Sequence, residues 1–203
     1  TEFLLVGGTN GAPMNLDEVI SAHELLGGFP SQFQIEVRDT ADRAVDYFLN
    51  TQQGLTFAVA AADHLTVTGN LDASKFSDLL DIDDLDLEGS DYTLTGNVSE
   101  VQEALNRFGA DVLATADAIT LTDGATSKVT LSVDQFDALR DVFTDLTHLN
   151  VVDAVAAVTE YGTGLSAVNR VTLEAESDGH DLTGVVVTDF DGVQAANIFT
   201  NGF

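Results

Sequence analysis

Residues 65–70 read LTVTGN, and nearly the same stretch returns as YTLTGN at 92–97 and as ITLTDG at 119–124. Both intervals are twenty-seven residues long. In each copy two apolar side chains alternate with threonines, which is the pattern of a strand with one buried face. A strand with one short helix cannot bury its apolar face alone, whereas stacked copies can. The equal positions would then stack in a shared core: Leu65, Tyr92 and Ile119.

The repeat predicts an α/β fold that is β-rich, built as an irregular solenoid-like stack of strand plus short-helix repeats of about 27 residues. The stretch L-x-V-x-x-N also matches part of the leucine-rich repeat pattern, but its upstream and downstream leucines are missing, so that alternative is less well supported. With no linker or low-complexity tract, we expect one domain, 1–203. It would comprise an N-terminal cap region, 1–64, a repeat core, 65–145, and a C-terminal cap region, 146–203.

Local signals place helices between the strands. In the first two copies a Gly-Asn turn is expected to lead into a short helix, and in the third a second strand at 128–132 precedes a longer helix. Residues 33–40 alternate as a strand does, and a helix capped by Asp39 or Thr40 follows. Residues 151–162 read as helical. Capping boxes, in which two residues three apart bond each other's backbone N–H, are predicted at Asn15 with Glu18, Ser99 with Gln102, and Ser132 with Gln135.

The charge balance restricts the partners of the chain. Seven basic residues face 34 acidic ones, 24 of them Asp, and the net charge is −27. Such a surface repels nucleic acid and anionic lipid, and it repels itself unless salt or bound cations screen it. An extracellular space with divalent cations and a high-salt cytoplasm both fit, and the excess of Asp favours the first. No apolar run approaches the ~18 residues of a membrane span, so membrane insertion is not expected.

An acidic run at 81–91, DIDDLDLEGSD, is the candidate metal site. Hard cations such as calcium take several carboxylate oxygens at once, and clustered acids repel one another unless something binds. The order of residues excludes an EF-hand loop, because Leu85 and Gly89 stand at the wrong positions. The alternative is a solvated strand edge with Leu85 and Leu87 inward. The candidate ligands are Asp81, Asp83, Asp84, Asp86, Glu88 and Asp91.

Other chemistry finds little support in the sequence. The absence of cysteine excludes disulfides, thiolate zinc sites and cysteine nucleophiles. The glycines at 7, 8 and 11 do not form a dinucleotide-binding pattern, and no serine lies in a nucleophile-elbow motif. The four histidines are not paired at ligand spacings: His23, His64, His148 and His180. We therefore predict no catalytic residue, no enzyme activity, and no cofactor except calcium.

Residues 37–48, VRDTADRAVDYF, resemble a repeat of very large bacterial surface proteins that are exported by type I secretion. Those repeats run as a strand, then Asp-Thr-Ala, then a short amphipathic helix. The match is carried by Val37, Asp39, Thr40, Ala41, Val45 and Phe48. The resemblance implies adhesion, surface coats or matrix as the function. The chain departs from such proteins in lacking the Gly-Asp nonapeptide of calcium β-rolls.

These features predict a non-enzymatic structural protein that is secreted or exposed on the cell surface. Its partners would be copies of itself, in a fibre or layer stabilised by cations, or it would act as an adhesive module. One alternative is a secreted protein that binds carbohydrate or haem. Another is a halophile cytoplasmic protein, which could be an enzyme.

Overall fold

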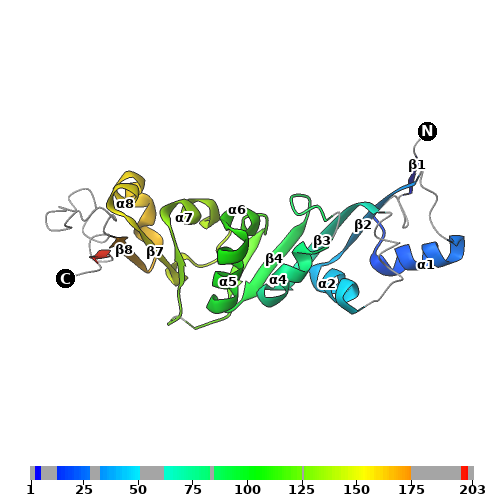
Figure 1. The fold of residues 1–203 in the computed structure, drawn as a ribbon, viewed down its shortest axis with the longest axis horizontal. Helices are drawn as coiled ribbons and strands as arrows, with labels where there is room; N and C mark the ends of the chain where they lie inside the picture. Colours follow the sequence, from blue (N-terminus) through cyan, green and yellow to red (C-terminus); the bar gives the residue numbers. More distant parts are fainter. Residues whose placement is uncertain are drawn as a thin grey trace. The chain divides into compact units, whose positions relative to one another are not determined.

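The computed structural model describes residues 3–5, 13–27, 33–50, 62–82, 85–124, 126–174 and 198–200. It is a mixed α/β protein with two parallel sheets and short helices (Figure 1). The chain divides into two compact units, the first formed by Thr1–Thr95 with Thr115–Ile119 and the second by Gly96–Ala114 with Thr120–Phe203. Among the described residues, no helix has the length and apolar character needed to cross a membrane.

Strands of the first sheet follow one another in chain order, and the pairs β1–β2, β2–β3 and β3–β4 are parallel. The strands are β1 (Phe3–Leu5), β2 (Phe33–Thr40), β3 (Ala62–Asp72), β4 (Asp91–Gly96) and β5 (Ala118–Leu121). Helices separate them: α1 (Leu16–Leu26), α2 (Ala41–Asn50), the 3-10 turn η1 (Ala73–Lys75) and α4 (Phe76–Leu80). The predicted strand at 33–40 and the helix after it are both confirmed.

The predicted burial of the two apolar side chains in each repeat is confirmed for β3 and β4, whereas in β5 Ile119 is buried and Leu121 is only half-buried. Leu65 and Val67 of β3 are buried, as are Tyr92 and Leu94 of β4 and Ile119 of β5. The intervening threonines are only half-buried: Thr66, Thr68, Thr93, Thr95 and Thr120. The Phe76 and Tyr92 rings stack with centroids 6.5 Å apart, so β4 and the helix that precedes it share one core.

The predicted register of the repeat is wrong for β3 and β4. Tyr92 lies opposite Gly69, and Leu94 lies opposite Leu71, whereas Leu65 forms a bridge with Leu85. The reason is that β3 does not turn at Gly69 and Asn70 but continues to Asp72. Gly69 has a φ of 77°, which glycine adopts without strain, and the strand thereby brings Leu71 into the core. Leu65 and Tyr92 are therefore not register partners.

The second unit contains a sheet of order β6-β7-β8-β9, again with parallel neighbours. Its strands are β6 (Val129–Leu131), β7 (Leu149–Ala154), β8 (Arg170–Glu174) and β9 (Ile198–Thr200). Its helices are α5 (Val98–Phe108), α6 (Ala110–Leu113), α7 (Val133–Leu139), η2 (Leu146–His148), α8 (Val155–Tyr161) and η3 (Gly162–Ala167). Val151 lies opposite both Leu131 and Val171, and all three are buried.

Two predicted helices of this unit are shorter than expected. The helix predicted at 151–162 begins only at Val155, because Leu149 and Val151 alternate as buried strand residues in β7. The helix after Ser132 ends at Leu139, and Phe143 is buried beyond its end. The predicted extra strand at 128–132 is confirmed as β6.

Candidate functional site: aspartate clamps

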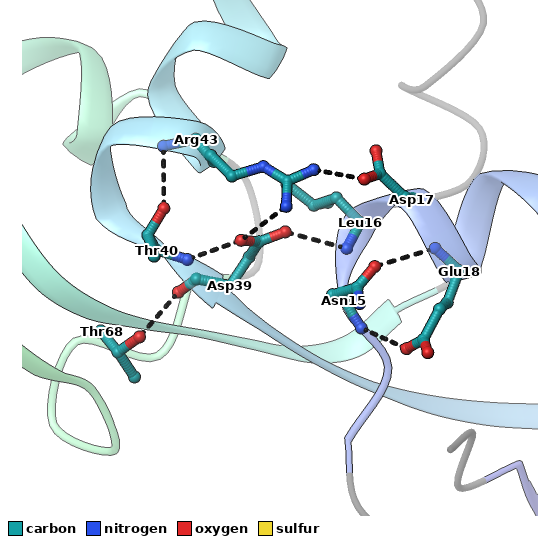
Figure 2. A network of polar contacts seen from close by, with 8 residues as sticks. All are labelled: Asn15, Leu16, Asp17, Glu18, Asp39, Thr40, Arg43 and Thr68. Carbon is teal, nitrogen blue, oxygen red and sulfur yellow. Dashed lines mark hydrogen bonds and ion pairs between the residues drawn. The ribbon is translucent and has the colours of Figure 1, made fainter. Parts of the chain in front are cut away.

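Asp39 lies at the end of β2 and bonds the backbone at the start of two helices (Figure 2). The Leu16 N–H, the first of α1, donates to Asp39 Oδ2 at 3.1 Å. The Thr40 N–H, directly before α2, donates to Asp39 Oδ1 at 2.7 Å. Because the first N–H groups of a helix have no partner within the helix, one carboxylate satisfies donors from both helix starts.

Short-range caps complete both helix starts. Asn15 and Glu18 form the predicted capping box, since each side chain accepts the other residue's backbone N–H at 3.0 Å. At the start of α2, the Arg43 N–H donates to Thr40 Oγ1 at 3.3 Å. The long-range contact of Asp39 is therefore added to local capping and does not replace it.

Arg43 lies beside the Asp39 carboxylate, and Thr68 bonds the backbone of Asp39. Arg43 Nη2 donates to Asp17 Oδ2 at 2.6 Å, and Arg43 Nη1 lies 3.7 Å from Asp39 Oδ1. The hydrogen bond with Asp17, followed by the charge of Asp39, raises the pKa of Arg43. Thr68 Oγ1 of β3 donates to the Asp39 carbonyl oxygen at 3.3 Å. Asp39 thus joins α1, β2, α2 and β3 while it is only 7% exposed.

Asp153 of β7 repeats this geometry in the second unit. The Val133 N–H, the first of α7, donates to Asp153 Oδ2 at 2.9 Å, and the Ala154 N–H donates to Asp153 Oδ1 at 2.7 Å. The predicted capping box of Ser132 with Gln135 is confirmed at the start of α7. A carboxylate near a strand end therefore again binds the start of the preceding helix and the N–H of the last residue of its own strand.

Asp123, which follows β5, binds the first N–H of α5, from Val98, at 2.9 Å. The capping box of α5 is formed by Asn97 and Glu100, so the predicted box of Ser99 with Gln102 is wrong. The box lies two residues earlier because β4 ends at Gly96 and the helix begins at once. We call Asp39, Asp123 and Asp153 the aspartate clamps.

The clamps share a sequence signal that motif analysis did not recognise. Each aspartate stands two residues after an apolar strand residue, namely Val37, Leu121 and Val151. Of the three, only Asp39 is predicted as a helix cap, because it stands directly before its own helix. The bonds of Asp123 and Asp153 with Val98 and Val133 join residues that are distant in the chain. Chemically, these carboxylates accept backbone hydrogen bonds at element ends, which is a scaffold role.

Residues of the predicted metal site are described only in part. Asp86 Oδ1 accepts the Gly89 N–H at 3.0 Å, and Asp91 forms an ion pair with Arg38. Asp81 and Glu88 are exposed, whereas Asp83 and Asp84 lie outside the described residues. Within the residues that the structure covers, no three His, Cys, Asp or Glu side chains gather as metal ligands. The calcium site therefore stays a prediction.

An open depression of about 680 Å³ lies in the second unit, beside α5. Eight of its nine lining residues are of polar type, two of them acidic and two basic, and none is aromatic or a histidine. The lining residues are Val98, Ser99, Gln102, Glu103, Asn106, Arg107, Asp123, Ser127 and Lys128. Sugar-binding sites use aromatic platforms and haem sites use axial ligands, so this depression favours neither ligand.

No known protein family, curated protein or solved structure matches the chain.

Proposed function

We propose that this chain is a non-enzymatic structural module of a secreted or cell-surface protein. In this proposal its strand-plus-helix units stack as in a solenoid, and the module joins copies of itself in a fibre or layer or acts as an adhesive stalk. The observation that carries the proposal is the recurrence of the aspartate clamp at Asp39, Asp123 and Asp153. Each of these bonds ties the start of a helix, α1, α5 or α7, to the end of the strand that follows it, and such contacts between neighbours in the chain stabilise a stacked scaffold.

The order of the strands supports stacking. In both sheets the neighbouring strands follow chain order, so each strand pairs with the strand before it and the strand after it in the sequence. Such proteins are stabilised by nearest-neighbour contacts, and they present extended surfaces to a partner. The resemblance of residues 37–48 to surface-protein repeats also favours the proposal, since Asp39 of its Asp-Thr-Ala stretch is a clamp.

The small number of basic residues supports a scaffold whose negative charges must be screened by salt or bound cations. Lys75 Nζ lies 3.2 Å from Asp42 Oδ1 and 3.1 Å from Asp46 Oδ1 on α2. These two hydrogen bonds raise the pKa of Lys75. Lys75 of η1 thus links two carboxylates of the preceding helix. With 34 acidic residues and only seven basic ones, most carboxylates need salt or bound cations instead.

The proposal is tested by measuring molecular mass and thermal stability in three conditions: with calcium, with a chelator and with high salt. We expect assemblies larger than the monomer in about 1 mM calcium chloride, partial loss of them in chelator, and a higher Tm with calcium. Light scattering after size exclusion and negative-stain imaging measure the assemblies. A strictly monomeric species in every condition would contradict self-assembly.

Two controls separate calcium binding from general screening. Magnesium at the same concentration supplies the same charge with a stricter geometry, so a calcium-specific site responds less to it. A variant with Asp81, Asp86 and Asp91 changed to Asn is compared with one in which Asp134, Asp137 and Asp141 are changed to Asn. If both lose the calcium response equally, the run at 81–91 is not the site. If Tm follows only salt near 1 M, the halophile cytoplasmic alternative is favoured.

A further inference from the structure

Of the three aspartate clamps, only Asp123 is followed by a glycine. Its Oδ2 accepts the Val98 N–H at 2.9 Å, and Gly124 is the next residue of the chain. Gly124 is exposed and lies in no helix or strand. Within the part of the chain that the structure describes, the Gly124 N–H has no hydrogen-bond partner. The backbone nitrogen beside this carboxyl group is therefore open to a reaction with it.

An aspartyl carboxyl group can close a ring with the nitrogen of the next residue. A bond forms between the Gly124 nitrogen and Asp123 Cγ, and the bond from Cγ to one carboxyl oxygen breaks. That oxygen leaves as water, with one proton from the neutral carboxyl group and one from the Gly124 N–H. The product is a succinimide ring. Glycine hinders this closure least, because it has no Cβ.

Water then opens the ring at one of its two carbonyl carbons. Attack at Cγ restores aspartate, whereas attack at the main-chain carbonyl carbon of Asp123 gives isoaspartate. In isoaspartate the chain continues through Cγ, which has become an amide carbon, so the Val98 N–H loses its carboxylate acceptor. We infer that Asp123 is a site of isoaspartate formation in the folded protein, and that this modification releases the clamp on α5.

The other two clamps are each followed by a residue whose backbone is held. Thr40 follows Asp39 and Ala154 follows Asp153, and both are paired residues of parallel strands. Each carries a Cβ, and the N–H of each donates to the carboxylate beside it at 2.7 Å. Ring closure there would have to break this hydrogen bond and loosen the strand end. Isoaspartate is therefore expected at one clamp and not at the other two.

Ageing of the folded chain at raised temperature, in water enriched in heavy oxygen, tests the inference. Each opening of the ring adds one heavy oxygen atom, and electron-transfer fragmentation of the peptides locates isoaspartate. We expect it at residue 123 and not at Asp39 or Asp153. In the isoaspartate form, hydrogen exchange at the start of α5 should be about tenfold faster, since a hydrogen bond to a charged group is lost.

A chain unfolded in guanidinium and aged in parallel is the positive control. Its three Asp-Gly pairs, at 123–124, 178–179 and 191–192, should all form isoaspartate, and their appearance sets the duration of the experiment. The last two pairs lie outside the described residues.

Gly124→Ala is the matched variant. A Cβ at Gly124 would meet no atom within 4 Å, and the φ of this residue lies outside the left-handed region, so the fold and the clamp should remain. The methyl group hinders ring closure, and we expect isoaspartate at residue 123 to fall to the level at Asp153, which precedes alanine. Asp123→Asn is a second variant, which should form the same ring faster by releasing ammonia from a group that is already neutral.

Two results would overturn the inference. One is isoaspartate at residue 123 in guanidinium but not in the folded chain, and the other is an equal amount in the wild type and in folded Gly124→Ala. Unchanged hydrogen exchange at the start of α5 in the isoaspartate form would overturn the release of the clamp.

Discussion

Asp39 and Asp153 perform the same task in different surroundings. Each binds the first N–H of a preceding helix with Oδ2 and the N–H of its own next residue with Oδ1. Asp39 is 7% exposed, with Arg43 beside it and Thr68 on its carbonyl oxygen. Asp153 is half-buried, and no ion pair joins it in the part of the chain that the structure describes.

The comparison shows that the clamp depends on backbone N–H groups, because these are common to both sites, and not on a neighbouring cation. It also implies that the two clamps differ in strength. A donor left without a partner in a buried site costs more free energy than one that water can reach.

Asp39→Ala is expected to have the largest effect. It leaves the buried Leu16 N–H without its acceptor, and we expect the free energy of unfolding to fall by about 2–3 kcal/mol. Urea denaturation measures the loss, and hydrogen exchange should rise at the start of α1. Asp39→Asn keeps one acceptor oxygen and should lose less. A loss below about 0.5 kcal/mol would show that Asp39 is not a clamp in solution.

Asp153→Ala is expected to cost less, about 1–2 kcal/mol, because water can reach this site. Faster exchange should be confined to the start of α7. Asp141→Ala is the control, since it also removes one negative charge but from a side chain that is 89% exposed. Equal losses for Asp39→Ala and Asp153→Ala would mean that burial and Arg43 do not distinguish the two clamps.

The smallest expected effect is a loss of stability in acid at two exposed turns, which contain Asp72 and Asp145. Hydrogen bonds from the Ser74 hydroxyl and N–H lower the pKa of Asp72, and those from Thr147 lower the pKa of Asp145. A carboxyl whose pKa is lowered in the folded state stabilises the fold at pH values above its ordinary pKa of 3.8. This contribution is lost as the pH falls through the pKa of the folded state. We therefore expect both turns to lose this stabilisation in acid.

Carboxyl chemical shifts measured through an acid titration test this expectation. Ser74→Ala should raise the pKa of Asp72 towards 3.8 and leave Asp145 unchanged, and Thr147→Val should do the reverse. Titration of either wild-type carboxyl at or above 3.8 would contradict the assigned hydrogen bonds.

Part of this fold could be predicted from local pattern. The capping boxes at Asn15 and Ser132 were predicted correctly, because both partners lie within one helical turn. The box at Ser99 was placed wrongly because two overlapping patterns, N-x-x-E and S-x-x-Q, compete there. Only the end of β4 at Gly96 decides between them, and that end depends on strand pairing.

The sequence by itself determined the charge of −27, the face that each strand buries and the start of several helices, because these depend on composition and near neighbours. Tertiary structure alone decided that Tyr92 lies opposite Gly69, and that Asp123 and Asp153 clamp helices which begin many residues earlier. Pairing between parallel strands selects among several registers with the same alternation, so no local pattern states which distant N–H a carboxylate will meet.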